Sequence, residues 1–259
     1  MRLYIAGSLE NMDTGGANIP TTQENLYFLE SFYAKRKWEK WISLAPLDTD
    51  RFMLDSGAFV MINSGGKSKI KDLDGYIVDY IDFIKTHKIK LYVEMDIDKV
   101  IGLEEVHRIR AKLHRETGIP PIPVMHKHLG KDYFIELCKS YPYISLGIGP
   151  IKSEPFKPRY PYEKLHWFTE TAHKYGTKIH GLGFTAKSVI ADFHFDSVDS
   201  TSWMQGAIYG HVYHYKHGKL GLIQRPQKSR IKDRVKLQGH NLKQWILFQK
   251  YLNLAKGGK

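Results

Sequence analysis

Acidic and imidazole side chains recur in this sequence directly after short apolar runs. Asp55 follows FML, Asp96 follows the run YVEM, and His126 follows PVM. A fourth run, FDSV, contains Asp196 and is followed by Asp199. Carboxylates and imidazoles of this kind can act as nucleophiles, as general acids or bases, or as metal ligands.

Further polar and small residues surround these positions. Glu94, Asp96 and Asp98 alternate in YVEMDID, so we expect all three to face the same side of a strand. Glycine lets a backbone approach a ligand closely, and several of the runs end in glycine. The other residues expected to line a pocket are Ser56, Gly57, Gly147, Gly149, His180, Gly181 and Gly183.

The elements that must position these residues alternate along the chain, which is typical of βαβ units and a parallel sheet. We expect strands at 2–6, 51–54, 91–95, 121–125, 143–146, 178–182 and 195–198. We expect helices at 22–42, 75–87, 103–116, 132–140, 162–175, 186–191 and 241–255. Residues 206–224 alternate with period two around His217-Gly218, which predicts a β-hairpin.

The number of strand-helix units predicts an α/β fold of the TIM (β/α)8 type, with a hairpin insertion at 206–224 and a basic C-terminal helix. A doubly wound open sheet is the alternative. The chain has 259 residues and is 42% hydrophobic. Because no Gly-, Ser- or Pro-rich linker divides it, we expect a single domain over 1–259, with catalytic groups at the C-terminal ends of the strands.

The net charge of +12 is concentrated near the C-terminal end of the sequence. Residues 225–259 contain ten Lys or Arg and one acid, Asp233, with aromatic residues among them. This pattern predicts contact with a nucleic-acid backbone, and a solvated basic segment beside an amphipathic helix is the alternative.

The single cysteine, Cys138, excludes a disulfide or a thiolate zinc cluster within the chain. The first residues are expected to form a strand and a polar loop in place of a cleavable leader. No apolar run has membrane-spanning length. We therefore expect a cytoplasmic protein with no membrane partner.

Two chemistries suit these residues. In one, Asp55, Asp96 and His126 bind a divalent metal ion that activates water for hydrolysis. His126-x-His128 favours this reading, although no HExxH motif occurs. In the other, one carboxylate attacks the anomeric carbon of a sugar and a second handles the proton of the leaving base.

The series DSGAF, MDI, PVMH, LGIG, HGLGF and FDSVDS, over residues 50–205, resembles the tRNA-guanine transglycosylase (queuine tRNA-ribosyltransferase) superfamily. It is most similar to shortened, phage-type relatives without zinc, including 7-deazaguanine DNA transglycosylases. This resemblance implies that a guanine base is exchanged for a 7-deazaguanine base through a covalent glycosyl-aspartate, in the cytoplasm of a bacterial or phage-infected cell. It implies no cofactor, since the 7-deazaguanine base is a co-substrate.

The resemblance also implies roles for individual residues. Asp55 would contact the base and transfer protons, and Asp96 would recognise the purine edge. His126 stands where the family usually has glutamine, which changes base recognition there. The resemblance further places Gly147, Gly149 and the segment His180-Gly181-Leu182-Gly183 around the base.

Two residues compete for the role of nucleophile. The family's FD-plus-small pattern favours Asp196, whereas the SVDSTSW pattern of the phage-type relatives favours Asp199. If Asp196 and Val198 share one face of the strand, Asp199 lies at its exit, where barrel enzymes place catalytic groups, and we therefore prefer Asp199.

The family's cysteine-bound zinc subdomain, which helps to hold tRNA, cannot form here. The hairpin and the basic segment are expected to replace its surface, so we expect DNA in preference to tRNA, with a flipped base. Trp203, Tyr209 or Tyr213 would stack on a base. The alternatives are the metal-dependent hydrolase and a nucleic-acid-binding protein without activity.

Overall fold

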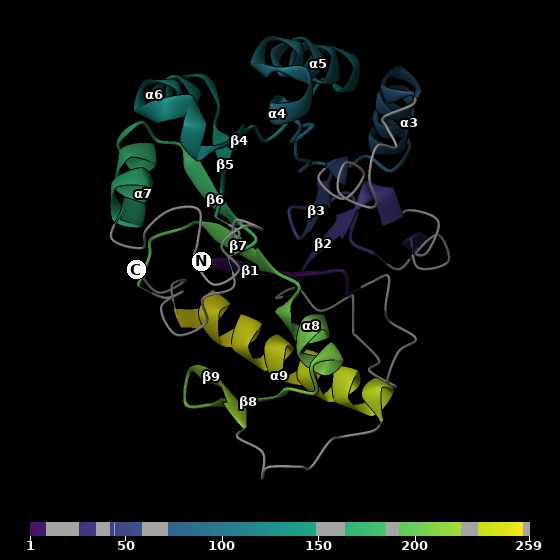
Figure 1. The fold of residues 1–259 in the computed structure, drawn as a ribbon, viewed down its shortest axis with the longest axis vertical. Helices are drawn as coiled ribbons and strands as arrows, with labels where there is room; N and C mark the ends of the chain where they lie inside the picture. The colour runs from purple at the N-terminus through teal and green to yellow at the C-terminus, as the bar shows by residue number, and fades with distance from the viewer. Residues whose placement is uncertain are drawn as a thin grey trace.

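The centre of the protein is a curled sheet of seven parallel strands in the order β3-β2-β1-β7-β6-β5-β4. The structure is a computed structural model, and it describes residues 1–8, 26–34, 42–43, 45–58, 72–148, 164–184, 192–223 and 233–255. The strands are β1 (Arg2–Ala6), β2 (Tyr27–Ser31), β3 (Phe52–Asp55), β4 (Val124–Met125), β5 (Tyr143–Gly147), β6 (Lys178–Leu182) and β7 (Ser197–Ser200). The sheet forms a half-barrel, which confirms the predicted mixed α/β class (Figure 1).

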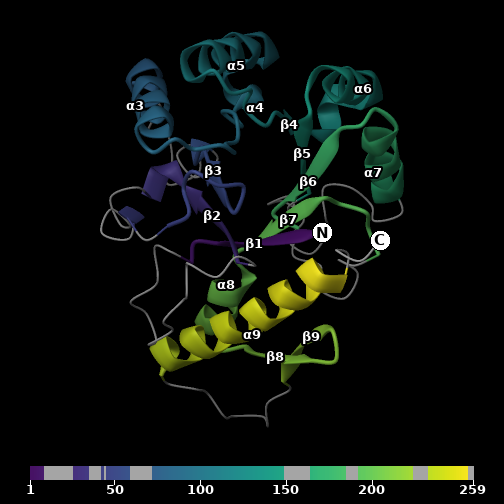
Figure 2. The same cartoon turned by 180° about the vertical axis from the view of Figure 1, so that it is seen from behind.

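Helices lie along the outer side of this sheet, as both views show (Figures 1 and 2). They are η1 (Phe32–Ala34), α3 (Leu73–Thr86), α4 (Asp98–Ile101), α5 (Leu103–Thr117), η3 (Lys127–Leu129), α6 (Gly130–Ser140), α7 (Leu165–Lys174), α8 (Ser202–Ile208) and α9 (Arg234–Ala255). Asp72 caps α3 by accepting from the N–H of Gly75 at 2.7 Å, and a stripe from Ile77 to Ile84 faces the sheet. None of the described helices is both long and apolar enough to cross a membrane.

Alternate strand residues form two apolar layers. Tyr4, Leu29, Met53 and Val93 pack together inside the curl. The intervening residues, such as Ile5, join the larger cluster that includes the buried faces of the helices. Residues that share the parity of the first group therefore point toward the interior.

The two ends of the sheet approach each other through residues outside the named strands. Leu54 of β3 forms a parallel bridge with Tyr92, and Val93 forms one with Ile122, two residues before β4. The N–H of Val93 donates to the carbonyl of Leu54 at 2.8 Å, and the N–H of Glu94 donates to Ile122 at 3.0 Å. The predicted strand at 91–95 is thus reduced to two bridging residues.

The predicted hairpin is confirmed. β8 (Val212–Lys216) and β9 (Lys219–Ile223) pair antiparallel, and His217 and Gly218 both have positive φ, as a two-residue hairpin turn requires. The pair lies against α9, which also contacts the sheet because the side-chain amide of Gln249 donates to the carbonyls of Leu3 and Tyr27 (Figure 1).

One predicted element is wrong. In the described part of the expected helix at 22–42, residues Tyr27–Ser31 form β2, between β1 and β3. Because both faces of this strand are buried, its apolar residues do not alternate with polar ones, and strand pairing overrides the local pattern. The helix expected at 186–191 lies outside the described residues, and α9 begins seven residues before the predicted 241.

Candidate active site and histidine-aspartate cluster

Asp199 lies on the inner face of β7, directly beside Tyr4 of β1 in register. It is 6% exposed, and within the described part of the chain both of its hydrogen bonds are made by Oδ1. The backbone N–H of Gly183 donates to this atom at 2.6 Å, and Nε2 of His180 lies 3.2 Å from it. A buried carboxylate held by two donors is fixed in direction, as a nucleophile must be.

A chain of hydrogen bonds supports Asp199 from behind. Nδ1 of His180 lies 2.5 Å from Oγ of Ser197, which lies 2.5 Å from the hydroxyl of Tyr143. With Asp199 ionised and His180 neutral, His180 donates through Nε2 and accepts at Nδ1 from Ser197, which in turn accepts from Tyr143. The order Tyr143, Ser197, His180, Asp199 thus has one donor direction throughout.

Asp55 ends β3 on the same inner face as Met53. Its Oδ2 accepts the N–H of Gly57 at 3.0 Å. Burial, with smaller contributions from the charges of Asp96 and Asp199, outweighs the lowering effect of the Gly57 N–H and raises the pKa of Asp55 to about 7. Asp96 and Asp199 therefore lie close enough to act on Asp55, whose pKa of about 7 lets it take up or release a proton near neutral pH.

Gly57 is required at its position because φ is +70° and a Cβ there would lie 2.5 Å from Oγ of Ser31. Ser56 is buried, and its carbonyl accepts from the hydroxyl of Tyr76 at 2.6 Å. Tyr80 donates to the carbonyls of Leu54 and Val93 at 3.2 and 2.8 Å. These contacts hold the end of β3, and with it Asp55, in place.

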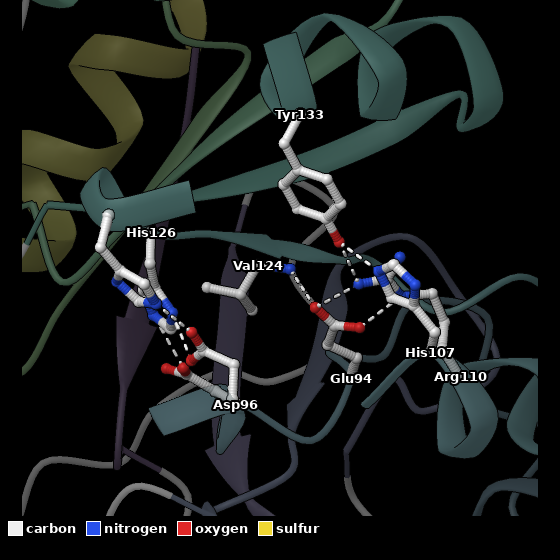
Figure 3. A network of polar contacts seen from close by, with 9 residues as sticks. Glu94, Asp96, His107, Arg110, Val124, His126 and Tyr133 are labelled. Carbon is white, nitrogen blue, oxygen red and sulfur yellow. Dashed lines mark hydrogen bonds and ion pairs between the residues drawn. The ribbon is translucent and has the colours of Figure 1, made fainter. Parts of the chain in front are cut away.

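His126 follows β4, and its ring lies beside the carboxylate of Asp96 in Figure 3. Its Nε2 is 2.8 Å from Oδ1 of Asp96, and its Nδ1 is 2.7 Å from Oδ1 of Asp98. The second oxygen of Asp98 is 2.6 Å from Nε2 of His128. Burial lowers the pKa of His126, but the hydrogen bonds and charges of Asp96 and Asp98 outweigh it and raise the pKa to about 9.

Glu94 does not share a face with Asp96 and Asp98, so that prediction is wrong. Its carboxylate binds Arg110 of α5 at 2.5 and 3.1 Å and accepts the N–H of Val124 at 2.6 Å (Figure 3). The chain leaves strand geometry after Val93, since 94–97 belong to no strand or helix, and the period-two pattern ends with it. Glu94 therefore joins α5 to β4 and is not one of the carboxylates that contact His126.

Three predicted site residues point elsewhere. Asp196 precedes β7 and binds His173 at 3.0 Å and the N–H of Ile179 at 2.8 Å, at a site where its side chain is 36% exposed. The position of a Cβ on Gly181 would meet Val198 and Ile148 in the outer layer. Trp203 is fully buried and donates to the carbonyl of Ala6 at 2.9 Å.

Of the remaining glycines, Gly147 ends β5 opposite Leu182, and Gly183 contacts Asp199 as described. Gly149 lies outside the described residues. Sequence reasoning gave no role to Ser197 or Tyr143, and considered His128 only as part of the His126-x-His128 pair. That spacing signalled His128, but the partners of Ser197 depend on strand register, which single-sequence patterns do not fix.

No protein-family model matches this chain, and no curated protein sequence matches it. The site is therefore interpreted from its own geometry.

Proposed function

We propose that this protein is a nucleic-acid guanine transglycosylase that exchanges guanine for a 7-deazaguanine base, with DNA preferred over tRNA. The observation that carries the proposal is that Asp55 of β3 and Asp199 of β7 share the inner face of the curled sheet and that the charges of Asp199 and Asp96 both act on Asp55. The resemblance of the motifs that contain them supports the same reaction.

Asp199 is the proposed nucleophile. Oδ2 attacks C1′ of the target nucleoside, a C–O bond forms, the C1′–N9 bond breaks, and its electron pair leaves with the guanine. The side chain of Asp55, protonated for a large part of the time at neutral pH, donates the proton that the leaving base requires.

The second half of the reaction reverses these roles. Asp55 takes the N9 proton of the incoming 7-deazaguanine, N9 attacks C1′, and the ester bond to Asp199 breaks. Asp96, whose Oδ1 contacts His126, recognises the purine edge. The two half-reactions regenerate both carboxyl groups and consume no cofactor.

For the fold, we propose that the sheet is a closed barrel of eight strands. The bridges from Leu54 to Tyr92 and from Val93 to Ile122 join its two ends through the short 92–93 segment. The parallel direction of both bridges supports this closure, and the carboxylates would then stand at the C-terminal mouth, where barrel enzymes carry their catalytic groups.

A nucleic-acid substrate is supported by the charge of +12 and by the basic residues of 225–259. In the described part of this segment, Arg234, Lys236 and Lys243 are exposed on α9. The exposed His214 and Lys216 of β8 extend the same character onto the hairpin. Duplex DNA would have to release its target base from the stack before Asp199 could reach C1′.

The test compares the wild type with Asp199→Asn and, as a matched control from the same segment, Asp196→Asn. Each protein is incubated with DNA or tRNA that carries labelled guanine, with and without a 7-deazaguanine base, and covalent adducts are resolved on denaturing gels. We expect exchange and an adduct in the wild type and in Asp196→Asn, and neither in Asp199→Asn. Turnover by Asp199→Asn, or metal-dependent hydrolysis without an adduct, would reject the proposal and favour the hydrolase.

A further inference from the structure

Two histidines and an aspartate from separate segments meet beside the proposed reaction centre. Asp98 begins α4, His126 follows β4, and His128 lies in η3. One ligand atom from each lies within 4.8 Å of the other two. We propose that Asp98, His126 and His128 form a transition-metal site that takes Zn²⁺.

The donor set decides which ions fit. Two imidazole nitrogens and one carboxylate oxygen suit Zn²⁺ and Co²⁺, whereas Mg²⁺ and Ca²⁺ prefer sites made of oxygen atoms. Asp98 already receives both imidazoles, one on each oxygen, at 2.7 and 2.6 Å. Ligand atoms of a tetrahedral zinc ion lie about 3.3 Å apart, so these contacts need to open by less than about 1 Å to admit it.

Asp96 provides the support that a metal-bound histidine requires. Such a histidine donates its second ring N–H to a carboxylate, which fixes the ring and directs the other nitrogen at the metal. Nε2 of His126 lies 2.8 Å from Oδ1 of Asp96, which is an ion-pair contact without hydrogen-bond alignment, whereas Nδ1 forms a hydrogen bond with Oδ1 of Asp98 at 2.7 Å. Asp96 is therefore a positioning residue for the metal site as well as part of the proposed reaction centre.

The environment resembles a metal site that stays open on one side. The side chains of Asp98 and His126 are 7% and 6% exposed, whereas that of His128 is 45% exposed. The two rings lie nearly parallel, 17° apart, with centroids separated by 5.7 Å. The exposed side of His128 gives an ion a route of entry and leaves room for water as a fourth ligand.

An ordinary surface pair offers a contrast. His173 contacts Asp196 at 3.0 Å, but both side chains are well exposed, at 42% and 36%, and among the described residues no second imidazole shares the carboxylate. This site also differs from the cysteine-bound zinc site of the family that the sequence resembles, because its ligands are two histidines and an aspartate. The cluster at Asp98 thus departs from the expectation of a protein without metal.

The test uses the full chain, stripped with a chelator, loaded with Zn²⁺, Co²⁺ or Mg²⁺, desalted, and measured for metal content. We expect about one zinc or cobalt ion per chain and no retained magnesium. His128→Ala, which changes an exposed side chain, should lower zinc affinity at least about tenfold, and Asp98→Asn should do the same. His173→Ala is the matched control and should bind zinc like the wild type.

Two further readouts do not depend on activity. The cobalt-loaded wild type should show the visible d–d absorption of a low-coordinate ion, and His128→Ala should not. Zinc should raise the Tm of the wild type and of His173→Ala, but not that of His128→Ala.

Failure of the wild type to retain zinc, or unchanged zinc affinity in His128→Ala with native circular dichroism, would overturn this inference. The outcome is separate from base exchange. If the protein binds zinc at this cluster but does not exchange bases, the proposed function alone is rejected. If it exchanges bases but does not retain zinc, the metal site alone is rejected.

Discussion

The backbone N–H of Gly183 reaches across from the end of β6 to Oδ1 of Asp199, on the neighbouring strand, at 2.6 Å. His180 contacts the same oxygen. The other oxygen, Oδ2, receives no hydrogen bond from the part of the chain that the structure describes. Contacts from β6 and the residue after it thus hold one oxygen of the carboxylate, and the other is the atom that we propose attacks C1′ of a substrate. The predictions below follow from this division and from the groups around it.

Ser197 should control the rate of the first half-reaction without touching the substrate. Ser197→Ala breaks the chain from Tyr143 to His180, so His180 loses the partner that fixes its ring behind Asp199. We expect the single-turnover rate of adduct formation to fall by about tenfold with an unchanged KM. Rapid-quench gels measure the rate, and recovery in Ser197→Thr would confirm that the hydroxyl is responsible. A larger KM with an unchanged rate would contradict this role.

The pKa of Asp55 predicts how stability depends on pH. It is about 7 in the folded protein, against 3.8 ordinarily, and the groups that face it are Asp96, Asp199 and the phenols of Tyr76 and Tyr80. Between these two pKa values the folded chain keeps a proton that the unfolded chain has lost. The stabilisation from neutral Asp55 is therefore fully present below about pH 4 and is lost as pH rises through about 7.

Asp55→Asn should remove this dependence. We expect the unfolding free energy of the wild type, relative to the variant, to decrease between about pH 4 and about pH 7 and to level off above that. Urea denaturation across this range measures the difference. Parallel curves for the two proteins would show that the pKa of Asp55 is not raised.

Arg110 should matter for stability far more than its neighbour Arg108. Arg110→Ala leaves Glu94 buried without its cation, so the cost in unfolding free energy should be about 3–5 kcal/mol. Arg108→Ala breaks an exposed pair with Glu105 and should cost less than about 1 kcal/mol. Equal midpoints of urea unfolding for the two variants would contradict the structural role of Glu94.

Tyr209 should contribute to nucleic-acid binding, whereas Trp203 should contribute to stability alone. Trp203 is fully buried and bonded to Ala6, whereas Tyr209 is 71% exposed. Trp203→Phe should cost about 1–2 kcal/mol of stability and leave affinity unchanged. Tyr209→Ala should weaken single-stranded DNA binding by about 1–3 kcal/mol if a base stacks on it. Fluorescence anisotropy at fixed salt separates the two effects.

Much of the sheet could be predicted because its strands are short apolar runs. β1 has the predicted bounds, and α3 and α5 agree to within two residues at each end. β2 could not be predicted, since Phe28 and Leu29 are both buried and remove the alternation that identifies a strand.

Some features of the candidate site could also be predicted from the sequence, and others could not. Asp55 ends β3 as predicted, because the end of a strand in a parallel sheet is a position that sequence reveals. Asp199 was predicted beyond the end of a strand at 195–198, but β7 spans Ser197–Ser200, so Asp199 lies within the strand. The contact of Asp98 with two imidazoles could not be predicted, because it depends on how 94–97 turns out of the strand. Glu94 shows the same limit, since only its partner on α5 explains where it points.

β1 pairs with β2 on one side and with β7 on the other, so that Tyr4 has Tyr27 and Asp199 as its two neighbours. The second edge of β1 is therefore covered by a strand that lies almost two hundred residues later in the sequence. Such distant pairing slows folding, because the chain must close a long loop before the contact is gained. The carboxylate proposed to attack nucleic acid is consequently assembled among the last parts of the fold, and an incomplete chain would carry an exposed strand edge but no reactive centre.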